Sequence, residues 1–418
     1  MESTAAHQQA PARFTRHPVV FALLYAPFGA TAGFVIVTMA FLATKRGLSI
    51  QQGAELVALQ YVPQIWKFLW APVADATLSR HRWYLVSVVL CAAGMFAMAT
   101  VPLGPSTFTL MQGIVLLSSL ASTFLCFAVE AMVAHLTPTE DMGRVSGWLQ
   151  AGNLGGTGIG GGLGLWLATV LPFAWETGLA LAVLTLGCAA VLPCVPEIPA
   201  DDLGASIGAT VRHTVAELWK VMRRRDGALC ALLCILPLGT GAASAVLGQA
   251  EVAAIWGVGA ATVSLIQGFL GGAVSMAGCI AGGYGCLRLG ARGGYATYGG
   301  LMALTTLAMA LLPETPTVYV IGNLAYQFVT GLTYAAFTAF VLEAIGAKLA
   351  ATKYNGFASI SNTPIWYMGL LLAAAQTQFG ARGMLATESV FGVVGILVFV
   401  AATRVWRPAA AASLAPAT

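Results

Sequence analysis

The chain has 418 residues, of which 58% are hydrophobic and only 9% are charged. A soluble globular domain carries about 25% charged residues, so this composition excludes a soluble protein of the same size. The 48 glycines agree with that conclusion, because membrane helices use glycine to let backbones approach closely. The formal net charge is only +4, so the positions of the charges are more informative than their sum.

Apolar stretches long enough to cross a lipid bilayer recur from residue 18 to residue 405. A hydrocarbon core of about 30 Å needs about 20 apolar residues in a helix. The polar segment 1–17 precedes an apolar run that is too long for a signal-peptide core, so this run is expected to remain as the first span. The sequence predicts twelve spans, at 18–44, 53–74, 84–102, 108–133, 145–171, 175–195, 227–249, 258–286, 294–312, 317–345, 356–378 and 387–405.

The basic residues are distributed unevenly between the predicted loops, and Lys and Arg in short loops set membrane orientation. If the N-terminus is cytoplasmic, 16 of the 20 basic residues fall on the cytoplasmic side. Only three, Lys45, Arg46 and Arg382, then fall outside, and Lys67 lies within a span. We therefore expect both termini to be cytoplasmic.

Two similar segments indicate an internal repeat. Glu130-Ala131 ends the fourth span and Glu343-Ala344 ends the tenth, and the same offset aligns Gly143 with Gly356. Parallel repeats of this kind are typical of carriers whose two halves move around a central path. The predicted domains are an N-terminal six-helix bundle (1–195), a cytoplasmic amphipathic linker (196–226) and a C-terminal six-helix bundle (227–418). The linker is a passive tether or a lipid-sensing, regulatory element.

Several motifs resemble those of a known family. The turn 71–82 is similar to the Asp-and-basic loop of the major facilitator superfamily, although it lacks the usual glycines, and its counterpart 283–292 has no Asp. The segments 66–72, 161–167 and 351–354, with Glu130-Ala131, resemble AmpG-like muropeptide permeases. This group also includes acetyl-CoA carriers and siderophore permeases.

The resemblance implies an all-α membrane protein of twelve transmembrane helices in two pseudo-symmetric six-helix bundles. It also implies a secondary active transporter of the bacterial inner (plasma) membrane that works by alternating access. Proton-coupled symport of a polar organic solute such as a muropeptide is the main expectation. The alternatives are a carrier of siderophores or acyl-CoA-type solutes and a drug or metabolite exporter. A non-transporting membrane sensor and a membrane-embedded enzyme are the alternatives from other classes.

Charged residues at bilayer depth cost at least about 2.5–3.5 kcal/mol on insertion scales, so those present are expected to have a role. Two interpretations compete. In the first, a charge network latches the cytoplasmic ends of the two halves together. In the second, Glu130 or Glu343 carries the coupling proton, because burial favours the protonated form of a carboxyl group. The predicted network consists of Asp75, Arg80, Arg82, Glu130, Arg144, Arg288, Arg292, Glu343 and Lys353.

Polar and aromatic residues within the spans are candidates for solute contact, because polar side chains avoid lipid. Hydrogen bonding between helices is the alternative role for each of them. Lys67 contacts an anionic solute or neutralises a neighbouring acid. The candidates are Tyr25, Gln60, Gln64, Lys67, Gln150, Asn153, Asn323, Tyr326, Gln327, Tyr334 and Trp366.

Other motif-like patterns do not indicate chemistry. The segment 156–161 matches GxGxxG but lies inside an apolar span, without the strand-turn-helix context of a dinucleotide site. Glycines every fourth residue from 152 to 164 instead indicate a close-packing helix face. The histidines lack metal-ligand spacing, and the eight cysteines are interpreted as small apolar residues. We expect no metal, no cofactor, no enzymatic activity and no nucleic-acid partner. A monomer that binds a small-molecule substrate, protons and the lipid bilayer is expected.

Overall fold

The computed structural model describes residues 17–46, 48, 50–199, 212, 216, 219–220, 222–345 and 350–405. All regular secondary structure in these residues is helical. The predicted linker, 196–226, lies largely outside the described part of the chain.

The first bundle contains the spans up to residue 194. In chain order its elements are α1 (Val19–Gly33), η1 (Phe34–Met39), α2 (Ala40–Lys45), α3 (Ile50–Ile65), η2 (Lys67–Leu69), α4 (Ala71–Ala76), α5 (Arg80–Thr100), α6 (Phe108–Leu136), η3 (Thr139–Asp141), α7 (Met142–Gly158), η4 (Ile159–Leu163), α8 (Gly164–Val170), α9 (Ala174–Gly187) and η5 (Cys188–Cys194).

The second bundle begins at residue 225. Its elements are α11 (Arg225–Ile235), α12 (Ala242–Leu247), α13 (Ala250–Ile255), α14 (Ala260–Leu265), η6 (Ile266–Leu270), α15 (Gly271–Leu311), α16 (Pro316–Ile345) and α17 (Ala350–Val405).

The helices match the predicted spans closely. Among the described residues, seven helices are long and apolar enough to cross a membrane, and two of them are 51 residues long. These two each divide at a glycine with positive φ, Gly290 (69°) in α15 and Gly380 (70°) in α17, a conformation that glycine adopts without steric cost. The spans at 50–76 and 225–247, which are interrupted, and the span at 142–170, in which the π-helical η4 joins α7 to α8, bring the crossings made by the described residues to twelve. The predicted all-α fold is confirmed.

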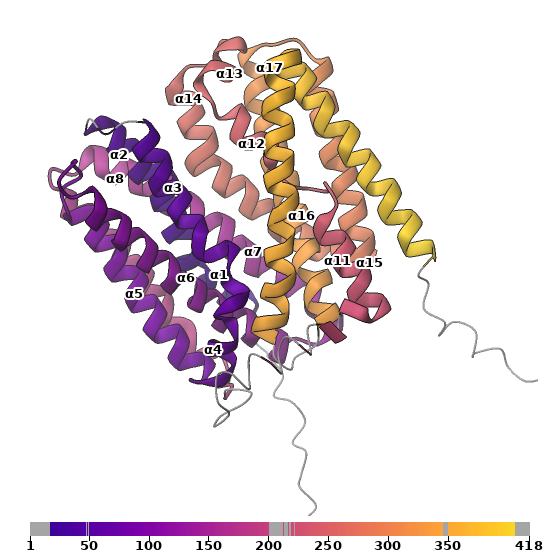
Figure 1. The fold of residues 1–418 in the computed structure, drawn as a ribbon, viewed down its shortest axis with the longest axis horizontal. Coiled ribbons are helices and arrows are strands. Elements are labelled where there is room, and N and C mark those ends of the chain that lie inside the picture. The colour runs from indigo at the N-terminus through magenta and orange to yellow at the C-terminus, as the bar shows by residue number, and fades with distance from the viewer. Residues whose placement is uncertain are drawn as a thin grey trace, which may run out of the picture.

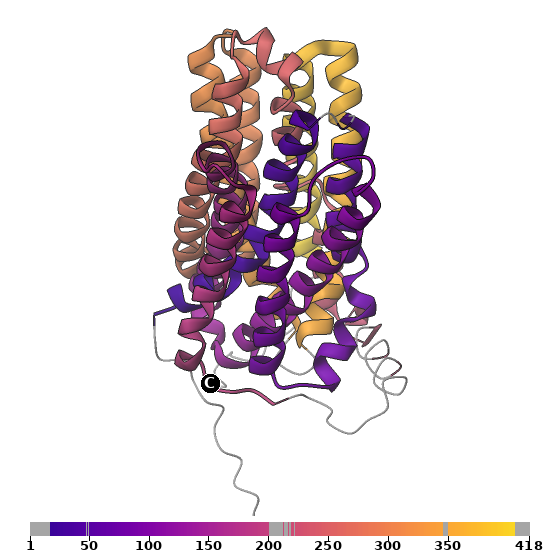
Figure 2. The ribbon, with the colours of Figure 1, turned by 90° about the vertical axis from the view of Figure 1, so that its left-hand side faces the viewer.

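The two bundles stand side by side, with indigo-to-magenta helices in one and pink-red-to-yellow helices in the other (Figure 1). α4 lies at the lower end of the first bundle in Figure 1, and α17 descends from the top of the second bundle to its end at the right, so these two ends lie on the same side of the molecule as the beginning of α1. This side of the molecule is called the terminal face below. Both bundles extend from it toward an opposite face (Figures 1 and 2), where α2 and α13 lie.

Glycine determines how closely the helices approach. A Cβ atom added at Gly156 or Gly160 of the fifth span would come within 2.3 Å of the Ala26 carbonyl oxygen or 1.9 Å of that of Ala30, both in α1. The predicted close-packing face is therefore confirmed. Another face of α7 packs against α15 of the second bundle, where a Cβ on Gly147 would lie 2.7 Å from the Cα of Gly283.

The seventh span is interrupted. α11 ends at Ile235, and α12 begins only at Ala242. Between them Pro237 has no N–H to donate, and Gly239 and Gly241 take φ values of 59° and 69°. The segment 236–241 is called the span-7 break below.

Candidate functional site

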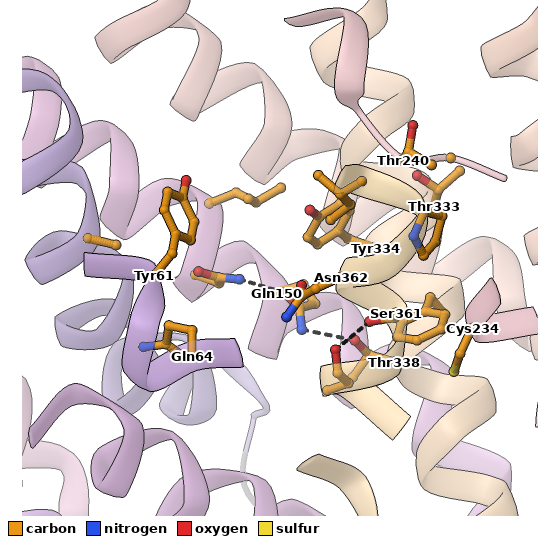
Figure 3. A pocket seen from close by; sticks show the side chains of 18 of the residues that line it. Tyr61, Gln64, Gln150, Cys234, Thr240, Thr333, Tyr334, Thr338, Ser361 and Asn362 are labelled. Atoms are coloured by element: carbon orange, nitrogen blue, oxygen red, sulfur yellow. Dashed lines mark hydrogen bonds between the residues drawn. The ribbon is translucent and has the colours of Figure 1, made fainter. Parts of the chain in front are cut away.

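A cavity of about 570 Å³ lies between the two bundles. Its lining comes from α1, α3, α6 and α7 on one side and from α11, α15, α16, α17 and the span-7 break on the other. Figure 3 shows Tyr61 and Gln64 of α3 facing Tyr334 of α16 and Asn362 of α17 across this space, with Gln150 of α7 between them. A cavity of this size can enclose a drug-sized ligand.

The floor of the cavity, toward the terminal face, is closed by a carboxylate that both bundles share. Glu130 on α6 is only 1% exposed. It accepts a hydrogen bond of 2.5 Å from the Tyr25 hydroxyl of α1 and one of 2.9 Å from the Asn355 amide of α17. The second bond crosses from one bundle to the other, so it holds the bundles together at this end.

Lys67 supplies a positive charge beside this floor. Its side chain is 7% exposed, and its Nζ lies 6.0 Å from the centroid of the Tyr354 ring. It interacts electrostatically with Glu130. The break between α3 and η2 places Lys67 here, at a bend of the second span.

A second set of bonds joins the bundles through α7. The Gln150 amide donates to the Thr338 hydroxyl of α16 at 2.9 Å and accepts from the Asn153 amide at 3.0 Å. Thr338 in turn lies 3.2 Å from the Tyr354 hydroxyl. Neutral bonds of this kind each contribute about 0.5–1.5 kcal/mol net, less than bonds to a charged group.

The cavity wall offers amides and aromatic rings for a ligand. Gln60 is 1% exposed, and neither its amide nitrogen nor its amide oxygen has a hydrogen-bond partner among the described residues. Gln64 donates to Ser122 at 3.3 Å. Trp366 is 67% exposed at the edge of the lining. A buried amide without a partner is costly, so Gln60 is suited to bind a polar solute group.

Three of the candidate solute-binding residues lie elsewhere. Asn323 and Gln327 belong to a cluster inside the second bundle, where the Gln267 amide donates to Asn323 at 3.1 Å and the Gln327 amide donates to Ser244 at 2.9 Å. Tyr326 donates to Glu388 at 2.7 Å. None of the three is among the described residues that line the cavity. By contrast, Tyr25, Gln60, Gln64, Lys67, Gln150, Asn153, Tyr334 and Trp366 all line it.

The predicted charge network is spread over separate places on the terminal face. Arg80 and Asp75 form a fully buried ion pair of 2.9 Å, and Arg80 also donates to the Ala74 carbonyl. Arg144 pairs with Asp141 at 3.1 Å at the surface.

The other members of the network lie nearer the surface. Arg82 and Arg288 are exposed. Arg292 lies over the Phe340 ring at 5.4 Å and interacts electrostatically with the exposed Glu343. The side chain of Lys353 lies outside the described part of the structure.

Two functional candidates were missed by the sequence analysis. Asn355 could not be recognised, because its partner Glu130 lies 225 residues away in the chain. Glu388, 4% exposed, carried a signal that was overlooked: it is an acidic residue inside the last apolar stretch.

A helical protein that crosses the membrane many times, with two bundles around a shared polar cavity, has the architecture of a solute carrier. The chain belongs to the Major Facilitator Superfamily, whose family profile matches residues 19–374. It is therefore a multi-pass membrane protein of a transporter family. A search of curated proteins finds no match.

Solved structures share the fold at low sequence identity. A proton:xylose symporter, XylE, bound to 6-bromo-6-deoxy-D-glucose, is 13% identical, with a TM-score of 0.67 over 92% of this chain and 95% of that one. The human organic anion transporter MFSD10 (TETRAN) is 16% identical, with a TM-score of 0.63 over 91% of this chain and 99% of that one. At these identities the likeness shows the fold alone.

Proposed function

We propose that the protein is a secondary active transporter that moves a polar organic solute by alternating access, in symport with protons. The observation that carries the proposal is the cavity shared by both bundles and closed at the terminal face by the Asn355–Glu130 bond. A carrier needs a central site with a closure that can be broken. One hydrogen bond to a carboxylate is strong enough to hold such a closure and weak enough to release it.

The moving bodies in this proposal are residues 1–195 and 227–418, joined by the linker 196–226. The terminal face is cytoplasmic, and the membrane is the bacterial inner membrane. The excess of Lys and Arg in the loops assigned to that side supports this orientation. The state described here is then closed to the cytoplasm.

The lining favours a solute that is polar, of moderate size and not strongly charged. Amides and aromatic rings bind sugars and peptides through hydrogen bonds and stacking. Lys67 and Glu130 lie together on the floor, so they offer little net charge to a polyanion. A muropeptide-like glycopeptide therefore fits better than an acyl-CoA-type solute, with a siderophore or an exported metabolite as the alternatives.

Glu130 has two compatible tasks in this mechanism. Ionised, it accepts from both Tyr25 and Asn355 and keeps the floor closed. Protonated, it is a weaker acceptor, and the bond between the bundles weakens. The latch and the proton site predicted from the sequence would then be the same carboxyl group.

Purified protein in liposomes tests the proposal. An inward proton gradient would be imposed and uptake of a radiolabelled muropeptide, a ferric siderophore and acetyl-CoA measured in parallel. We expect gradient-driven uptake of the muropeptide that a protonophore abolishes and that Gln60→Ala reduces. Protein-free liposomes control for leakage. Absence of uptake and of counterflow exchange for all three solutes would contradict the proposal.

A further inference from the structure

A second buried carboxyl group lies in the second bundle, behind the wall of the cavity. Glu388 is 4% exposed in the last span. Its Oε1 accepts a hydrogen bond of 2.7 Å from the Tyr326 hydroxyl of α16. Its Oε2 is buried, with no hydrogen-bond partner among the described residues.

No positive charge compensates Glu388 within the described residues. Its own segment, 381–405, contacts 291–311, α16 and the span-7 break, and α17 contacts α12. Their charged side chains lie toward the helix ends, and Arg382 is paired with Glu314 at 3.3 Å. The titratable groups that face this region are the tyrosines 295, 326 and 334. The charged residues of these elements are Arg292, Glu343, Arg382 and Arg404.

A short chain of bonds connects Glu388 to the span-7 break. The Tyr326 hydroxyl that donates to Glu388 also accepts from the Ala243 N–H, in the first turn of α12, at 3.2 Å. The break itself is held by Tyr295, whose hydroxyl donates to the Leu238 carbonyl at 3.0 Å. Leu238, Gly239 and Thr240 line the cavity. Tyr326 and the break therefore connect the carboxyl group to residues that line the cavity.

We propose that Glu388 is a proton-binding site of the second bundle, reached from the cavity through the span-7 break. A proton adds to the carboxylate at Oε2 and removes one negative charge, and its release restores that charge. Because an ionised carboxylate without a cation is costly inside a membrane, the closed arrangement holds Glu388 protonated. Deprotonation requires water to enter, and it can enter at the break, where the backbone of residues 237–241 donates no helical hydrogen bond among those of the described residues. This inference rests on the proposed function for its role in coupling, but its chemistry can be tested without a solute.

Infrared difference spectroscopy of the purified protein across a pH titration provides the first test. We expect the wild-type protein to show the C=O stretch of a buried carboxylic acid, and Glu388→Gln to remove part of that band. Glu314→Gln is the matched control, because Glu314 lies in an exposed ion pair and should leave the band unchanged. A full wild-type band in folded Glu388→Gln protein would overturn the assignment.

Hydrogen–deuterium exchange of the peptide 236–247 tests whether Glu388 is reached through the span-7 break. After correction for intrinsic rates, we expect protection in the wild-type protein to fall about tenfold as Glu388 loses its proton, which corresponds to about 1.4 kcal/mol. Glu388→Gln should stay protected at every pH, and Tyr326→Phe, which removes the hydroxyl that bonds both Ala243 and Glu388, should exchange faster at every pH. If the protection of this peptide depended on pH equally in wild type and Glu388→Gln, the proposed path through the span-7 break would be overturned. Neither measurement uses a solute, so a failed uptake screen would contradict the proposed function without deciding this one.

Discussion

Asn355 of the second bundle donates a hydrogen bond of 2.9 Å to Glu130 of the first bundle, across the floor of the cavity. Glu130 is held in place by Tyr25 of its own bundle. One bundle thus holds the carboxylate in position, and the other bundle donates a hydrogen bond to it. Such an arrangement lets a change at a single carboxyl group alter how firmly the bundles close.

Removal of the amide should therefore open the terminal face. In Asn355→Ala the bond to Glu130 is lost, and hydrogen bonds to charged groups contribute about 1.5–3 kcal/mol. We expect the terminal face to be open about ten- to a hundredfold more often. Cys286 reports this opening, because it is buried at the seam between α7 and α15, next to Gly143. The measurement is the rate of maleimide labelling in protein whose only cysteine is Cys286.

The matched control for this experiment is Gln376→Ala, which removes another amide from α17 away from the floor. Its labelling rate should equal that of the parent protein. If Asn355→Ala labels no faster than Gln376→Ala, the Asn355–Glu130 bond does not hold the closure.

Loss of the hydrogen bond between Gln150 and Thr338 should also open the terminal face, but less than loss of the Asn355–Glu130 bond. Thr338→Val keeps the shape of the side chain and removes the hydroxyl that accepts from Gln150. Both partners are neutral, so the expected cost is about 0.5–1.5 kcal/mol. Labelling of Cys286 should therefore increase less than in Asn355→Ala. The reverse order of the two variants would show that the main closure lies at α7 and α16.

Substitution of a glycine between α1 and the fifth span should destabilise the first bundle. In Gly160→Ala the new Cβ would meet the Ala30 carbonyl at 1.9 Å, so the helices must separate. Overpacking of this kind costs about 1–3 kcal/mol. Gly113→Ala in α6 is the control, since its Cβ would have no atom within 4 Å. The midpoint of thermal unfolding in detergent should fall for Gly160→Ala and hold or rise for Gly113→Ala, and equal midpoints would contradict the packing argument.

The ion pair between Arg80 and Asp75 should matter for stability more than any exposed pair. Both side chains are buried, and removal of one partner from a buried pair costs about 3–5 kcal/mol. Asp75→Asn should therefore lower the unfolding midpoint strongly. The half-exposed pair of Arg144 with Asp141 is the comparison, and Asp141→Asn should change stability by less than about 1 kcal/mol. Similar losses in both variants would show that burial does not decide the effect.

The spans could be predicted from the sequence alone, because each is a continuous apolar stretch whose length is set by the thickness of the bilayer. The sequence was also sufficient for the glycine face of the fifth span, since the spacing of four residues places those glycines on one side of a helix. It identified Glu130 and Lys67 as buried charges from their depth within apolar segments.

Partners across the bundles could not be predicted. Whether Glu130 faces Asn355 depends on how two separately folded bundles meet, and no local pattern encodes that. The interruption at 236–241 did have a signal, because a proline and two glycines occur within five residues of an apolar segment. Glu388 was overlooked because it is the second residue of the last predicted span, 387–405, where an acidic residue is easily assigned to the preceding loop.

The seam between α7 and α15 has a mechanical consequence. Gly147 and Gly283 meet there with bare backbones, whereas most helix pairs interlock side-chain ridges with grooves that must disengage before the helices can slide. Two helix faces that lack side chains can rotate against each other while they remain in contact. The energy barrier to reorientation of the bundles would then come from the hydrogen bonds between them around the cavity. Changes in the strength of those few bonds would change the turnover rate without changing the axis about which the bundles rotate.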